Sequence, residues 1–230
     1  MKMTTQLNHE ISQQLLVHKD ENYALFEAKL IPNIDPSLII GVRAPILRQI
    51  ARNIVKSGNL SFIQTLPHNW HEENLLHAYV LCNLKNYDTA LHATDLFLPY
   101  VDNWAVCDSL SPKAFANHQH VLMADIKRWI NNNHEYSVRF AIGMLMRHFL
   151  DSHFDTQHLD LVTHLQRNEY YIRMMQAWYL ATALAKQWDS TLPIFSQQIL
   201  DPWVRQKAIQ KAIESFRITD EHKKILRQLR

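Results

Sequence analysis

Three short stretches, EYSVR at residues 135–139, EYYIR at 169–173 and DPWVR at 201–205, decide how this chain folds. Each begins with an acidic residue, has Val or Ile three positions later, and ends with Arg. The acidic residues stand 34 positions apart (135 to 169) and then 32 positions apart (169 to 201). A period of this length is the sequence signature of a repeat protein, in which one small unit of secondary structure recurs.

Weaker copies extend the pattern toward the N-terminus. DNWA at 102–105 and ENLLH at 73–77 keep the acid, whereas APILR at 44–48 keeps the Arg without it. An acid near the start of a helix meets unpaired backbone amides and the positive end of the helix dipole. The Val or Ile then enters the core, and the Arg can reach the acid of the adjacent repeat. The pattern resembles the second helix of a HEAT repeat and predicts a ladder between stacked helix pairs.

The rest of the chain favours helices as well. Its 230 residues include only three glycines, and sandwiches, barrels and dinucleotide-binding folds need more of them at turns and phosphate loops. Apolar residues recur four apart at Leu76, Val80 and Leu84, and the nearly all-apolar stretch 170–187 predicts a buried helix. We therefore predict an all-α protein of HEAT-like repeats, stacked into a curved solenoid as a single domain over residues 1–230.

The composition argues against several other classes. Cys82 and Cys107 form no CxxC pair, which fits a reducing cytoplasm and no disulfide framework. The first ten residues lack an apolar signal core, and no apolar run approaches the roughly 18 residues of a membrane span. The string HEENLLH at 71–77 places its histidines six apart, off one helical face, so we predict no metal site. The formal charge of +2 is weak support for a polyanionic partner.

One repeat copy differs from the others because it carries an aromatic residue and a second acid. Trp104 and Asp108 lie four positions apart in NWAVCD at 103–108, so a helix would place the ring and the carboxylate side by side. Such a pair suits an electron-poor, cationic substrate, through cation–π and Coulomb attraction. The spacing also allows Trp104 to pack in the core and Asp108 to cap the turn that follows.

With these residues in view, the chain resembles the AlkD-like family of HEAT-repeat DNA alkylpurine glycosylases. The resemblance runs from GVRAP at 41–45 to IQK at 209–211. In that family two tryptophans, an aspartate and an arginine line the concave cleft. The residues of this chain at those four positions are Trp104, Asp108, Arg139 and Trp178.

The resemblance implies hydrolysis of the N-glycosidic bond of a cationic 3- or 7-alkylpurine, with the lesion held in a basic cleft. Asp108 would stabilise the positive charge that develops on the sugar and position water. Trp104 and Trp178 would contact the deoxyribose and the lesion, and Arg139 would hold a phosphate. Arg139 also occupies the ladder position of its repeat, and Trp178 lies in a helix apolar enough for core packing, so structural roles for both stay open.

Six further basic residues are candidate contacts to the DNA backbone: Lys113, Arg147, Arg173, Lys186, Lys207 and Lys211. The predicted partner is double-stranded DNA carrying alkylated bases, in the cytoplasm, with no membrane association, obligate protein partner, metal or organic cofactor. Two alternatives remain. One is a non-catalytic family member that binds damaged or branched DNA, and the other is a protein-interaction scaffold, as many HEAT arrays are.

Overall fold

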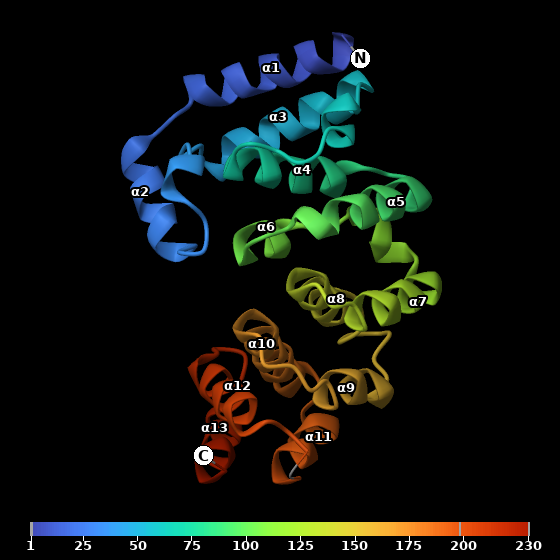
Figure 1. Ribbon diagram of the computed structural model, residues 1–230. Helices are drawn as coiled ribbons and strands as arrows, with labels where there is room; N and C mark the ends of the chain where they lie inside the picture. The colour runs from blue at the N-terminus through green and yellow to red at the C-terminus, as the bar shows by residue number, and fades with distance from the viewer. Residues whose placement is uncertain (1, 198, 230) are drawn as a thin grey trace. The chain divides into compact units, whose positions relative to one another are not determined.

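The computed structural model describes residues 2–197 and 199–229, and every regular element in these two ranges is a helix (Figure 1). The predicted all-α class with helical repeats is therefore confirmed. None of the described helices combines the length and apolar character needed to cross a bilayer. The chain divides after His118 into two compact units, unit 1 before that point and unit 2 from Gln119 onward. Each unit is described by itself, and the single domain expected from the sequence stays a prediction.

Unit 1 is organised around α4 (His71–Asn83), which packs against α3, α5 and α6. Every residue of α4 from His71 to Leu81 is buried, so the helix runs through the core of the unit. The other elements of unit 1 are α1 (Lys2–Val17), α2 (Glu21–Leu30), η1 (Pro36–Leu38), α3 (Ala44–Ser57), η2 (Ser61–Gln64), α5 (Tyr87–Phe97), η3 (Leu98–Tyr100), α6 (Trp104–Ser109) and η4 (Lys113–Asn117).

A buried carboxylate on α4 holds the loop that precedes α3. Glu72 accepts backbone N–H bonds from Ile40 at 2.9 Å, from Val42 at 3.2 Å and from Gly41 between them. Gly41 has a φ of +86°, and a Cβ atom at this position would lie 2.0 Å from the carbonyl oxygen of Asp20. Only glycine fits such a place, since both the backbone conformation and the close approach exclude a side chain.

Unit 2 repeats one arrangement of helices. The second helices of successive pairs, α8 (Glu135–His148), α10 (Tyr170–Lys186) and α12 (Pro202–Glu214), pack side by side, with α10 between the other two (Figure 1). The remaining elements of unit 2 are α7 (Gln119–Ile130), α9 (Thr156–Thr163), α11 (Trp188–Thr191), η5 (Leu192–Ser196) and α13 (Asp220–Gln228). The apolar residue of each repeat copy is buried, as predicted: Val138, Ile172 and Val204.

The predicted ladder is present at the junction of α10 and α12. Arg173 pairs with Asp201 at 2.7 Å, and Asp201 also caps α12 by accepting a bond from the backbone N–H of Val204 at 3.0 Å. Arg205, in the same register as Arg173, donates to the carbonyl oxygens of Phe195 at 2.9 Å and Leu229 at 2.6 Å. The repeat arginines therefore fasten neighbouring elements to one another, through a carboxylate in one case and through backbone carbonyls in the other.

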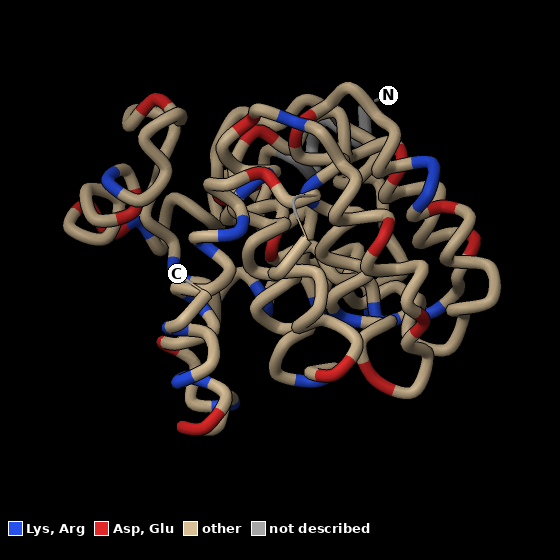
Figure 2. The backbone as a smooth tube through the Cα atoms, turned by 90° about the horizontal axis from the view of Figure 1, so that it is seen from below, with Lys and Arg blue, Asp and Glu red and all other residues tan. Residues whose placement is uncertain are grey.

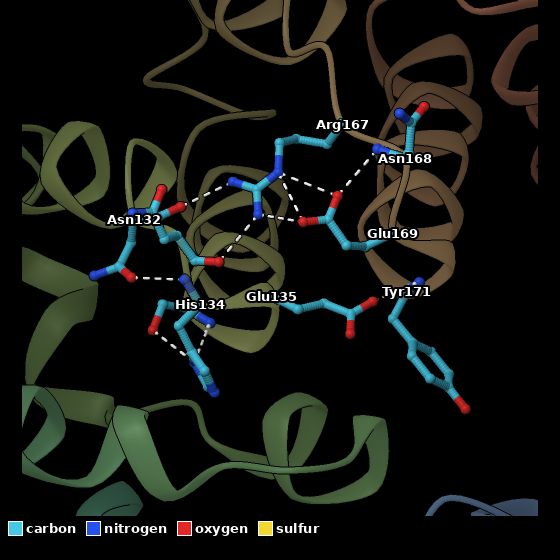
Figure 3. Close-up of polar contacts among 9 residues, drawn as sticks. Asn132, His134, Glu135, Arg167, Asn168, Glu169 and Tyr171 are labelled. Atoms are coloured by element: carbon cyan, nitrogen blue, oxygen red, sulfur yellow. Dashed lines mark hydrogen bonds and ion pairs between the residues drawn. The ribbon is translucent and has the colours of Figure 1, made fainter.

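The junction of α8 and α10 uses a different arginine to hold the acid (Figure 3). Arg167 pairs with Glu169 and also donates to the carbonyl oxygens of Asn132 and Asn133, at 2.9 and 3.1 Å. Glu135 accepts a bond from the backbone N–H of Tyr171 at 3.1 Å. The acidic residues of the repeat pattern thus lie at the junctions between helices, where they accept bonds from backbone N–H groups and pair with arginine.

Candidate functional site

The short helix α6 sets Trp104 and Asp108 one turn apart, as the sequence predicts. Asn103 begins the helix by accepting a bond from the N–H of Val106 at 3.0 Å. Its buried amide also contacts the ring of His71 at 3.3 Å. Trp104 and Asp108 are both half-buried, so neither is sealed in the core, and core packing of Trp104 is not what the structure shows.

The indole of Trp104 is held in one orientation by a segment far away in the sequence. Its Nε1–H donates to the carbonyl oxygen of Leu30 at 3.0 Å. A second bond joins the same regions, because the side-chain amide of Asn33 donates to the carbonyl oxygen of Asp102 at 2.6 Å. The end of α2 and the segment after it therefore hold the start of α6 and the indole of Trp104 in place.

The surroundings of α6 include residues that the sequence reasoning missed. Tyr79, on α4, has its hydroxyl 3.5 Å from the Oγ atom of Ser109, the residue after Asp108. The guanidinium of Arg48 lies over the Tyr79 ring, 5.1 Å from its centroid. Arg48 is the last residue of the weak repeat copy APILR at 44–48. The repeat pattern was therefore the sequence feature that could have pointed to Arg48.

A second carboxyl group with unusual electrostatics lies on α2. The pKa of Glu27 is raised to about 7, mainly by burial and also by the nearby Glu72, against the opposing effects of a hydrogen bond from Tyr23 and the charge of Arg43. One Glu27 oxygen is buried without a hydrogen-bond partner. The guanidinium of Arg43 covers the Tyr23 ring at 4.5 Å. The protonation state of this carboxyl therefore changes near neutral pH, which no pattern in the sequence predicts.

In unit 2 the structure brings two of the predicted residues together. Trp178, 38% exposed on α10, and Lys211 of α12 line one hollow of about 240 Å³. The rest of its lining is small or polar: Ala181, Thr182, Ala185, Glu214, Ser215 and Arg217. The apolar character of residues 170–187 correctly predicts a mostly buried helix, but Trp178 lies outside the core. Arg217 was not predicted as a contact.

Arg139 is 4% exposed, and its Nη1 donates to the carbonyl oxygen of Tyr171 at 2.8 Å. Glu135 accepts a bond from the N–H of the same residue. Both backbone groups of Tyr171 are therefore bonded to side chains of α8. Arg139 thus joins α8 to α10 through a backbone carbonyl, whereas its place in the repeat predicted a bond to the acid of the next repeat, Glu169, which pairs with Arg167. The phosphate contact that the family resemblance implies stays a prediction.

The other basic candidates have differing surroundings. Lys113 is exposed at the start of η4, and Arg147 is half-buried beside Gly143, where a Cβ atom would lie 2.9 Å from its Nη1. Lys186 pairs with Asp151 at 2.6 Å. Arg173 and Lys207 approach the ring of Trp203, at 4.7 and 5.9 Å. Of these six residues, the hollow beside Trp178 includes Lys211 alone.

The histidines of the string at 71–77 have separate partners. His71 contacts Asn103, whereas His77 lies 2.9 Å from His68 and stacks on Phe97 with ring centroids 3.9 Å apart. Burial lowers the pKa of His71 to about 4. Within residues 2–197 and 199–229, no cluster of three or more His, Cys, Asp or Glu side chains could hold a metal ion.

The fold is that of an all-α protein built of helical repeats. Over residues 11–211 the chain matches a family described as DNA alkylation repair enzyme. This match covers most of the chain, so the protein belongs to that family, as the sequence resemblance implied, and its role lies in DNA repair. No match is found among curated proteins.

Proposed function

We propose that this protein is a DNA glycosylase that hydrolyses the N-glycosidic bond of cationic 3- or 7-alkylpurines in duplex DNA. The observation that carries the proposal is α6, which sets the half-buried Trp104 and Asp108 one turn apart with the indole oriented by Leu30. Family membership supports a DNA substrate. An aromatic face beside a carboxylate is the environment in which positive charge on a base or a sugar is stabilised.

The reaction follows from the charge of the lesion. Because the alkylated purine is already a cation, the bond from C1′ to nitrogen breaks with its electron pair going to the base, which leaves as a neutral molecule. Positive charge then develops on the deoxyribose, where the Asp108 carboxylate stabilises it. Water adds to C1′ and gives up a proton, for which Asp108 is the proposed acceptor. An abasic site results, and the steps need no metal or organic cofactor.

The other predicted residues have roles in binding. Trp178 would contact the lesion strand with its exposed ring face, and Lys211, together with the newly found Arg217, would meet phosphates. Arg139 would contribute a phosphate contact in addition to its bond to Tyr171. We propose no obligate protein partner, and a cytoplasmic location, which the two cysteines favour.

The test is excision of 7-methylguanine or 3-methyladenine from a duplex by the parent protein and by Asp108→Asn. The amide keeps the size of the side chain but removes its charge, so we expect at least a 100-fold lower excision rate with duplex affinity unchanged. The matched control is Asp88→Asn, a charge change on an exposed residue of α5, which should excise like the parent. Equal activity of Asp108→Asn and the parent would refute the mechanism.

A second function is favoured by one specific observation. The hollow with Trp178, Lys211 and Arg217 is a binding feature that needs no chemistry. If the parent binds alkylated duplex at low salt and releases no base, the protein is a non-catalytic binder of damaged or branched DNA. If it binds no DNA at low salt, where phosphate contacts are strongest, the scaffold alternative is favoured instead.

A further inference from the structure

Phe216 is a fully exposed aromatic residue, with a relative exposure of 102%. It lies in the short connection between α12 and α13, which hydrogen bonds hold in place. The Ser215 N–H donates to the carbonyl of Ala212 at 3.1 Å, and the Ser215 Oγ accepts from the N–H of Arg217 at 3.2 Å. Ile218, two residues after Phe216, is buried. The backbone therefore presents Phe216 to solvent from a defined turn.

Exposure on this scale has no benefit for folding, because a side chain that buries no surface contributes no hydrophobic stabilisation. The place of Phe216 is also particular. Its two neighbours, Ser215 and Arg217, line the same hollow as Trp178. Two exposed aromatic side chains, one on α10 and one on the turn, thus belong to one small region of unit 2.

The charge of this region indicates what it binds. Residues 202–229 contain seven Lys and Arg against three Asp and Glu, a formal charge of +4, whereas the whole chain has only +2. Lys and Arg recur along this part of the chain, close to the C-terminus (Figure 2). Lys211 and Arg217 line the hollow, and its one acid, Glu214, already accepts a bond from the Gln210 amide at 2.9 Å.

The occupant that fits these features is nucleic acid. An apolar peptide would need a mostly apolar lining, but five of the eight residues that line this hollow are lysine, arginine, glutamate, serine and threonine. Aromatic rings interleaved with cations are the combination that binds stacked bases and their phosphates. A rigidly presented phenylalanine can also enter a base step and partly unstack it.

We propose that Phe216 inserts against a nucleobase of the bound duplex and opens the base step there, while Lys211 and Arg217 bind the flanking phosphates. This inference rests on the proposed DNA-binding function and adds to it a residue and a mode of contact.

The experiment measures duplex affinity and base unstacking separately. The probe is a duplex with one 7-methylguanine and an adjacent 2-aminopurine, whose fluorescence rises when it leaves the stack. The parent should bind and raise the fluorescence. Phe216→Ala should bind about tenfold more weakly and give no rise, and Phe216→Trp should restore both. The matched control is Leu96→Ala, which truncates an exposed apolar side chain of α5 and should behave like the parent.

The outcomes separate this inference from the proposed function. If the parent binds the duplex and Phe216→Ala equals it in affinity and fluorescence, the wedge is wrong and the DNA-binding proposal stands. If the parent binds no duplex, the proposed function itself fails. A thermal midpoint several degrees lower in Phe216→Ala would assign the residue to the fold and overturn the wedge. Binding of the parent to anionic lipid vesicles that Phe216→Ala loses, with duplex binding retained, would overturn it in favour of a membrane surface.

Discussion

The central helices of the two units, α4 and α10, are both largely buried but bury different chemistry. The buried residues of α4 include five polar side chains: His71, Glu72, Glu73, Asn74 and His77. The buried part of α10 is apolar apart from the amide of Gln176 and the hydroxyl of Tyr179. Charged and titratable groups on α4 therefore tie unit 1 together from inside, whereas the ion pairs of α10 lie at its two ends, at Arg173 and Lys186.

This contrast teaches where each unit is vulnerable. A buried carboxylate that accepts several backbone bonds is costly to remove, because its donors are then left unpaired. An apolar core with ion pairs at half-exposed junctions loses little when one pair is broken. We expect substitutions that remove a buried charge from α4 to cost more stability than substitutions that break an ion pair of α10.

The largest expected effect is that of Glu72→Ala. It leaves the N–H groups of residues 40–42 without their acceptor, so the free energy of unfolding should fall by about 3–5 kcal/mol. The matched variant in unit 2 is Gln176→Ala, which removes bonds to the carbonyl oxygens of Val162 and Leu165 and should cost about 1–2 kcal/mol. Denaturant unfolding of both variants measures the difference, and equal losses would end the contrast between the units.

A second prediction uses the opposite pH responses of groups in unit 1. Burial lowers the pKa of His68 and of His71 to about 4, so the unfolded chain takes up protons first and stability falls as pH drops from about 6.5 to about 4. Glu27 has its pKa raised to about 7, so the folded chain takes up the proton first and stability rises as pH drops from about 7 to about 4.5.

Glu27→Gln removes the carboxyl group that stabilises the fold as pH drops and leaves the histidines that destabilise it. Between pH 7 and pH 5 this variant should lose about 1 kcal/mol more stability than the parent, a value discounted because Glu27 is only half-buried. Denaturant unfolding at the two pH values measures it. The matched control is Glu214→Gln, an exposed residue of α12, which should follow the parent. An identical pH dependence of Glu27→Gln and the parent would contradict the raised pKa.

A smaller effect is expected at the junction of α10 and α12. Arg173→Met removes the pairing with Asp201 and the guanidinium over the Trp203 ring but keeps an unbranched side chain, so we expect a loss of about 1 kcal/mol. A double-mutant cycle with Asp201→Asn isolates the coupling between the two side chains. A coupling above about 3 kcal/mol would mean that unit 2 depends on its charges as unit 1 does.

The smallest effects compare the two tryptophans. Trp104→Phe loses the bond to the carbonyl oxygen of Leu30 and should cost about 1 kcal/mol of unfolding free energy, whereas Trp178→Phe loses no recorded hydrogen bond and should stay within about 0.5 kcal/mol of the parent. Thermal unfolding of the two variants distinguishes them. A larger loss of unfolding free energy for Trp178→Phe than for Trp104→Phe would show that the Trp178 ring stabilises the fold and would argue against a role in ligand binding.

The sequence predicts the helices and the repeat register because both depend on local rules. The acid at the helix start, the buried Val138, Ile172 and Val204, and the bond from Arg173 to Asp201 follow from one short pattern. The polar interior of α4 does not follow, because it depends on which loop folds over Glu72. That loop lies 30 to 32 residues earlier in the chain, and no periodicity connects the two.

The candidate site was predictable in part for the same reason. The spacing of Trp104 and Asp108 fixes their relation once α6 forms, and this geometry is confirmed. The partner of Trp104, the Leu30 carbonyl, is a tertiary contact without a pattern. Core packing for Trp178 was a fair alternative because its helix is apolar, and only the structure shows an exposed ring beside Lys211.

Arg205 has the same place in the repeat as Arg173 but different partners. Arg173 pairs with the acid of the next repeat, Asp201, whereas the guanidinium of Arg205 donates to the carbonyl oxygen of Leu229, the residue after α13. The end of α13 thus lies where the acid of a further repeat would bind. To add a repeat after α12, a designer would therefore have to remove α13 and supply a carboxylate for Arg205 to pair with. A repeat fused after α13 could not pair with Arg205, because its guanidinium is already bonded to the Leu229 carbonyl.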